Sequence, residues 1–180
     1  MKAFSFIIAA LFFVSSGFTP APINNGDEEK AVKWYSFEEA VELSKKDKRK
    51  IFVDVYTDWC GWCKRMDKTT FSDPDIAKIL NEKFYAVKLN AEDKKPVMFR
   101  DKEYVFKSEY KTHELALSLM GGRSGYPTTV YLDEDFNLLH KQPGYLTPDK
   151  LDNILVFFGD DLYKTEKWDE FIKNRTSDSN

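Results

Sequence analysis

Cysteine and histidine are scarce in this sequence, which has two of each among 180 residues. The cysteines are Cys60 and Cys63, in the stretch "DWCGWCK". A zinc site normally takes four ligands, and His113 and His140 lie far from the cysteines and from each other, so we expect no metal. A structural staple is also a poor interpretation, because the entropic gain from a disulfide grows with the length of the loop that it closes.

Two further interpretations of the cysteine pair are a haem attachment site and an inert pair. Covalent haem attachment normally requires C-x-x-C-H, whereas Lys64 follows Cys63. If instead Cys60 begins a helix, free backbone N–H groups and the helix dipole favour its thiolate. Cys63 would then lie within disulfide reach. Cys60 could attack a substrate disulfide and Cys63 could resolve the mixed disulfide without any cofactor. The inert pair remains open.

Long apolar runs are absent except near the N-terminus, between Ala3 and about Val14. This run is shorter than the roughly 20 apolar residues of a spanning helix. It follows Lys2 and precedes small residues and prolines, which is the layout of a secretory signal peptide. An uncleaved membrane anchor is the alternative. Since no cysteine suited to lipid attachment follows the run, we expect 1–21 to be a cleaved signal peptide and the mature protein to be periplasmic or otherwise exported.

The overall composition is that of one globular domain, with 42% hydrophobic, 16% aromatic and 32% charged residues. The net charge of −3 argues against a general affinity for nucleic acid or anionic lipid. We therefore expect protein or small-molecule partners and no nucleic acid. Residues 22–31 are expected to form a flexible lead-in, 32–174 the folded domain, and 175–180 a disordered tail.

The hydrophobic pattern predicts strands that alternate with helices. Strands are expected at 32–36, 50–57, 83–90, 126–133 and 137–142, and helices at 36–48, 64–71, 72–80, 112–120 and 147–158. This order predicts an α/β fold with a mixed central sheet and helices on both faces.

Several helix boundaries carry local signals. Ser36 and Glu39 stand in capping-box register, and Asp73 and Thr147 each precede a proline that suits a first helical position. A further helix in the tail is expected to fray after Asn174.

The segment "IFVDVYTDWCGWCKRM" resembles the active-site segment of the thioredoxin superfamily, and the predicted order of elements resembles the thioredoxin fold. The resemblance covers roughly Val32 to Phe158, apart from a charged and aromatic insertion at about 91–111, and a C-terminal helical extension follows. The dipeptide Gly61-Trp62 departs from the Gly-Pro of thioredoxin. With its leader, the chain is more similar to the exported thioredoxin-like proteins of bacteria.

The resemblance implies roles for residues around the cysteines. Asp54 matches a buried aspartate that helps to move the proton of the second cysteine, and Lys88 matches its partner. Burial should raise the pKa of Asp54, and a purely structural ion pair with Lys88 is the alternative. The loop "YPTT" matches one whose proline is cis, and Gly144 matches a glycine ahead of the last helix. The residues expected to contact substrate are Trp59, Gly61, Trp62, Tyr126, Pro127 and Thr128.

Two functions follow as hypotheses. The first is an exported thiol-disulfide oxidoreductase that reduces protein disulfides with electrons from a membrane donor. Its catalytic residues would be Cys60, Cys63, Asp54 and Lys88. The second is a thioredoxin-fold binding or chaperone module acting in periplasmic protein assembly. Its insertion would grip a partner through the aromatics Phe99, Tyr104, Phe106 and Tyr110. The alternative for the insertion is a surface hairpin that covers an edge of the core.

Overall fold

The structure is a computed structural model that describes residues 31–177. The expected signal peptide at 1–21 and nearly all of the expected lead-in lie outside the described residues. The centre is a five-stranded sheet in the order β1-β3-β2-β8-β9. Its strands are β1 (Trp34–Tyr35), β2 (Lys50–Tyr56), β3 (Phe84–Asn90), β8 (Thr128–Leu132) and β9 (Leu138–Pro143). Strands β1 and β2 each pair in parallel with β3, β8 pairs antiparallel with β2, and β9 pairs antiparallel with β8, which confirms the predicted mixed sheet.

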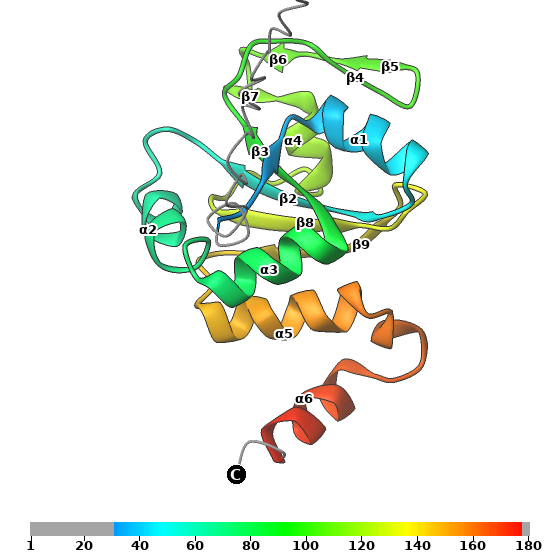
Figure 1. Cartoon of the computed structure of the whole chain (residues 1–180). Coiled ribbons are helices and arrows are strands. Elements are labelled where there is room, and N and C mark those ends of the chain that lie inside the picture. Colours follow the sequence, from blue (N-terminus) through cyan, green and yellow to red (C-terminus); the bar gives the residue numbers. More distant parts are fainter. Residues whose placement is uncertain (1–30, 178–180) are drawn as a thin grey trace, which may run out of the picture.

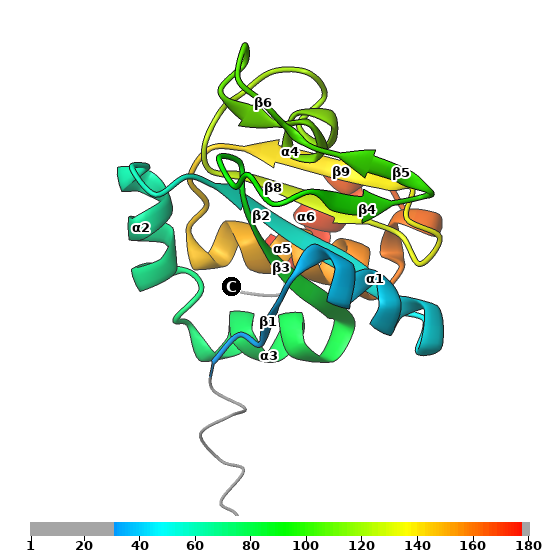
Figure 2. The same ribbon diagram turned by 90° about the horizontal axis from the view of Figure 1, so that it is seen from above.

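Helices cover both faces of this sheet (Figures 1 and 2). These are α1 (Phe37–Lys46), α2 (Gly61–Thr69), α3 (Pro74–Lys83), α4 (Glu114–Leu119) and α5 (Pro148–Gly159), whereas α6 (Trp168–Ser177) packs against α5 on the side away from the sheet (Figure 1). Alternate residues of β2 point to opposite faces. Ile51 and Val53 join a core cluster with α1 and α4, whereas Phe52 joins a second cluster with α2, α3 and α5. Asp54 therefore faces the same side as Phe52.

The helix starts follow the predicted signals with one difference. The Ser36 hydroxyl accepts from the Glu39 N–H, and the Glu39 carboxylate accepts from the Ser36 N–H, which confirms the capping box. Asp73 caps α3 through its side chain. Thr147 occupies the cap position of α5, but its hydroxyl makes no capping bond. That turn relies instead on the fixed backbone of Pro148 and on the first backbone hydrogen bonds.

The C-terminal helix extends beyond the predicted end at Asn174. Helix α6 reaches Ser177, so the expected disordered tail is wrong for 175–177. Arg175 forms an ion pair with Asp152 of α5, and the Ser177 hydroxyl donates to the Lys173 carbonyl. These contacts hold the last turn in place.

The insertion contains two small hairpins. The first joins β4 (Val97–Phe99) to β5 (Lys102–Tyr104), and the second joins β6 (Phe106–Lys107) to β7 (Thr112–His113). Phe99 is buried and packs edge-to-face on Phe37 of α1, with ring centroids 5.0 Å apart. The hypothesis that Phe99 grips a partner is therefore wrong. The strand period of two turns Phe99 inward and leaves Met98 exposed.

Candidate active site

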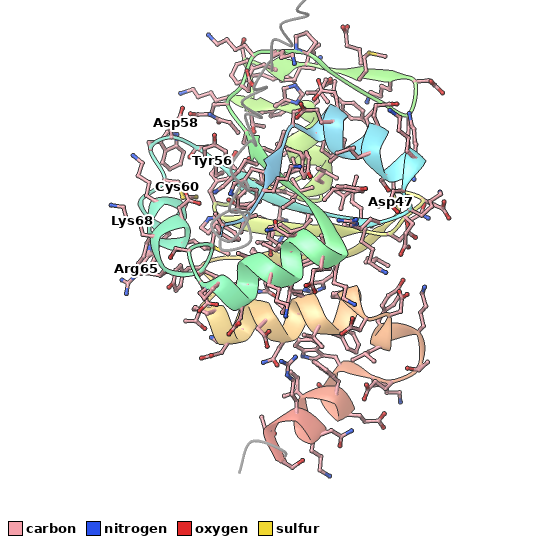
Figure 3. All side chains as sticks on the ribbon, viewed as in Figure 1. Asp47, Tyr56, Asp58, Cys60, Arg65 and Lys68 are labelled. Carbon is pink, nitrogen blue, oxygen red and sulfur yellow. A yellow bond between two sulfur atoms is a disulfide. The ribbon has the colours of Figure 1, made fainter. Side chains whose placement is uncertain are left out.

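The two cysteines lie where β2 passes into α2. Cys60 is the cap residue of α2 and is joined to Cys63 by a disulfide, with the Cα atoms 5.3 Å apart. The Cys63 N–H donates to Cys60 Sγ at 3.1 Å. The first turn of α2 therefore directs at the Cys60 sulfur an N–H that has no hydrogen-bond partner within the helix. In the reduced form this hydrogen bond would stabilise a thiolate. Figure 3 shows Cys60 at the start of α2, with Arg65 and Lys68 further along the helix.

Two tryptophans form an exposed rim beside the disulfide. Trp59 and Trp62 are 66% and 56% exposed. The Trp59 indole N–H donates to a Glu92 carboxylate oxygen at 3.0 Å, and the Trp62 ring packs against Tyr145 at 5.5 Å. Gly61, between Cys60 and Trp62, has open space where a side chain would project. The rim is therefore accessible to a polypeptide, whereas Cys60 and Cys63 themselves are only 4% and 2% exposed.

The predicted proline loop lies beside this rim. The Tyr126–Pro127 peptide bond is cis, and the Tyr126 ring packs edge-to-face on Trp59 at 5.9 Å. Thr128 is buried, and its hydroxyl donates to the Gly125 carbonyl. The Thr128 side chain is therefore turned inward, and its backbone belongs to β8, where it pairs with Val55 of β2 and Pro143 of β9. Gly144 adopts a positive φ of 93° ahead of α5, and its N–H donates to the Pro127 carbonyl.

Asp54 and Lys88 lie opposite each other on β2 and β3 and form an ion pair of 2.7 Å. Burial raises the pKa of Asp54 to about 6, although Lys88 opposes this shift. Among the described residues, the second oxygen of Asp54, Oδ1, has no hydrogen-bond partner. A buried carboxylate with a raised pKa and a free oxygen is suited to accept a proton near neutral pH.

Lys88 has a second carboxylate partner, Asp67 of α2, which the sequence reasoning missed. The signal was present in the sequence, because Asp67 lies four residues after Cys63 and thus on the same helical face. The Lys88 ammonium also lies 4.9 Å from the ring centres of both Trp34 and Phe71. Burial tends to lower the pKa of Lys88, but the two carboxylates outweigh it and raise that pKa, so the ammonium stays charged.

Glu92, Tyr110 and Tyr145 also lie near the site, and the sequence reasoning did not assign them to it. Glu92 follows the end of β3, and the carboxyl ends of the parallel strands β2 and β3 meet at the same edge of the sheet. That rule could have placed Glu92 beside Trp59. Tyr110 and Tyr145 belong to loops whose direction no local pattern determines.

Both histidines have structural partners. His113 accepts from the Leu115 N–H at the start of α4, and His140 stacks on Phe158. Within 31–177, no group of three or more His, Cys, Asp or Glu side chains could hold a metal ion. None of the helices in that range is long and apolar enough to cross a membrane.

The strand order, the helix-capping C-x-x-C disulfide and the cis-proline loop define a thioredoxin-fold protein. The sequence model of the thioredoxin-like domain family matches residues 37–159, and the chain belongs to this family.

Three similar proteins illustrate the range of the family. A Caenorhabditis elegans protein is 32% identical over 129 residues, which are 70% of this chain and 16% of that protein. The thiol:disulfide interchange protein DsbD of Yersinia pestis is 28% identical over 81 residues, 41% of this chain and 14% of DsbD. A solved thioredoxin-fold protein from Helicobacter pylori superposes with a TM-score of 0.54 at 20% identity, covering 84% of this chain and 95% of that one. The chain thus spans less than a fifth of the two curated relatives, and it is a thioredoxin-like domain similar to part of a thiol:disulfide interchange protein.

Proposed function

We propose that this protein is a thiol-disulfide oxidoreductase that reduces protein disulfides through Cys60 and Cys63. The observation that carries the proposal is the position of Cys60. It caps α2, accepts a backbone N–H of the first turn, and is joined to a cysteine three residues on. An inert pair would not require an accessible aromatic rim or the buried carboxylate oxygen of Asp54 that has no hydrogen-bond partner among the described residues.

The reaction would begin with the reduced protein. The Cys60 thiolate attacks one sulfur of a substrate disulfide, forms a mixed disulfide, and releases the other substrate sulfur as a thiolate that takes a proton from water. The Cys63 thiol then gives its proton to Asp54 and attacks Cys60 Sγ. This step releases the second substrate thiolate and forms the Cys60–Cys63 disulfide that the structure contains.

Each cycle moves two electrons from the two thiols to the substrate disulfide. A dithiol donor must therefore return the protein to its reduced form. Asp54 has a pKa of about 6, so it is mostly ionised at pH 7 and can accept the Cys63 proton, which then leaves to solvent. Lys88 stabilises the ionised Asp54 by a direct ion pair.

We further propose that the protein is exported to the periplasm and works as a reductant supplied by a membrane electron donor. The leader-like N-terminal sequence supports export. The similarity to DsbD, a thiol:disulfide interchange protein, supports electron transfer between thiol partners.

Reduction of insulin by dithiothreitol tests the activity. The wild-type protein should accelerate it, and Cys60→Ser should abolish the acceleration. A Cys60→Ser variant that still accelerates the reaction would overturn the nucleophile assignment. Cys63→Ser should instead trap substrates as mixed disulfides with Cys60. Equilibration in glutathione buffers tests the direction, since a potential near the roughly −120 mV of strong oxidants would contradict a reducing role.

The alternative hypothesis, a binding module that grips a partner through the insertion, has lost one of its four aromatic residues. Phe99 belongs to the core, whereas Tyr110 is 59% exposed. Deleting 93–109 would also remove Val97 and Phe99 from the core. Point variants of Tyr110 are therefore the better test of whether the insertion binds a partner.

A further inference from the structure

The last turn of the insertion is fixed against the proline loop. Thr112 is 1% exposed. Its hydroxyl lies 3.1 Å from both the Ala91 carbonyl and the Tyr126 hydroxyl. The neighbouring His113 N–H also donates to the Ala91 carbonyl, at 2.6 Å. The insertion therefore ends in a rigid connection to the loop that carries Pro127.

This connection places Tyr110 at a cavity beside Trp59. The cavity has a volume of about 350 Å³ and is lined by Trp59, Glu92, Tyr110, Lys111 and residues 124–126. Its walls come from the residue next to Cys60, the end of β3, the insertion and the residues before Pro127. The cavity thus adjoins both the tryptophan rim and the proline loop, which a substrate held by Cys60 would touch.

Three of the residues that line the cavity are aromatic, and the polar ends of two of these rings already have partners. The Trp59 N–H is bonded to Glu92, and the Tyr126 hydroxyl is bonded to Thr112. Tyr110 and Trp59 are both more than half exposed. The two charged residues of the lining, Glu92 and Lys111, have opposite signs, so the cavity has no net charge to select a charged group.

We infer that this cavity recognises one aromatic side chain of the substrate protein, at a position next to the cysteine that Cys60 attacks. The inference rests on the proposed oxidoreductase function. Aromatic rings pack favourably edge-to-face or offset, and three rings here surround one space large enough to admit a fourth. The insertion thereby makes the site selective among disulfides, which a bare C-x-x-C centre is not.

Symmetrical disulfide dimers of one hexapeptide test the inference. The peptide has a single cysteine, and the residue beside it is Phe, Leu, Ala or Lys, on either side in turn. Because the two sulfurs of each dimer are equivalent, attack on either gives the same products. With protein reduced by dithiothreitol and then freed of it, each molecule reduces one peptide disulfide, and we expect the second-order rate constant for the best Phe peptide to exceed that of the matched Ala peptide roughly three- to tenfold.

Variants of Tyr110 separate the cavity from the reaction. Tyr110→Ala should bring the Phe-to-Ala ratio close to one, and Tyr110→Phe should keep it. Met98→Ala is the matched control, since Met98 is a similarly exposed residue of the same insertion and does not line this cavity. It should leave both the ratio and the rates unchanged.

The outcomes distinguish the two proposals. Equal rates for Phe and Ala peptides, or a faster Lys peptide, would overturn the aromatic cavity and leave the oxidoreductase function standing. If no peptide is reduced, the oxidoreductase function fails, and peptides with Ser in place of Cys then decide the cavity. In that titration, NMR shifts of the Trp59 indole and the Tyr110 ring should saturate with the Phe peptide at lower concentration than with the Ala peptide, and equal titrations would overturn the inference.

Discussion

Asp67 on α2 shares one cation with the buried Asp54, because the Lys88 ammonium binds a carboxylate oxygen of each. Asp54 is 1% exposed at its side chain, whereas Asp67 is 44% exposed. Lys88 therefore links the buried Asp54 carboxylate to the partly exposed Asp67 of α2. Because the Lys88 charge is divided between two carboxylates, it neutralises Asp54 less fully than in a simple ion pair. Asp54 therefore holds a proton more tightly.

Asp67→Asn should move the acid limb of the activity profile to lower pH. The negative charge of Asp67 raises the pKa of Asp54. Its removal leaves Lys88 to Asp54 alone, lowers that pKa, and makes Asp54 a weaker base. We expect kcat at pH 7 to fall about two- to fivefold. Insulin reduction measured from pH 4.5 to 8 checks this.

Asp169→Asn is the matched control for Asp67→Asn, because it removes the same charge from an exposed site in the first turn of α6. It should leave the profile in place. If Asp54 had only a structural role, Asp67→Asn would change the stability of the protein without moving the acid limb.

Asp54→Asn should stabilise the oxidised protein at neutral pH. The pKa of Asp54 is about 6 in the folded state against its usual 3.8, so the folded state binds this proton more tightly than the unfolded state. The free energy of unfolding therefore falls as pH rises between these values. Asparagine resembles the protonated acid at every pH. The substitution should therefore increase the free energy of unfolding by roughly 2 to 3 kcal/mol at pH 7.

Urea denaturation at pH 7 and at pH 3.5 checks the prediction for Asp54→Asn. The difference between variant and wild type should nearly vanish at the lower pH, because Asp54 is then largely protonated in both states. An equal gain at both values would show that ionisation of Asp54 is not its cause.

Phe99→Ala should destabilise the fold by about 2–4 kcal/mol, since the ring is buried between α1 and the first hairpin of the insertion. Met98→Ala, on the opposite face of the same strand, should change the free energy of unfolding by less than about 0.5 kcal/mol. Chemical denaturation of both variants gives the comparison. Similar losses for the two would mean that this hairpin is not docked on the core.

Ser36→Ala should lower the free energy of unfolding by about 1 kcal/mol, because it removes the hydroxyl that accepts from the Glu39 N–H in the capping box of α1. Thr147→Ala should be close to neutral, since the Thr147 hydroxyl makes no capping bond. Thermal unfolding of the two variants separates a cap that bonds from one that only occupies the position. A larger loss for Thr147→Ala would contradict this distinction.

Local signals were sufficient for most of the secondary structure. The capping box at Ser36, the proline after Asp73 and the apolar run of β2 each act within one or two turns, so neighbouring residues contain the needed information. The sequence likewise indicated that Asp54 is buried, because it interrupts an otherwise apolar strand. Local signals did not predict where the C-terminal helix ends, because the last turn of α6 is held by the ion pair between Arg175 and Asp152 of α5.

By itself, the sequence determined the thioredoxin-like order of elements and the C-x-x-C pair at a helix start. Both follow from periodicity and spacing along the chain. Only the tertiary structure decided that Asp67 shares Lys88 with Asp54, that Phe99 points into the core, and that Tyr110 lies at the cavity beside Trp59. These relationships join residues from different elements, and their distances depend on how helices and loops pack against the sheet.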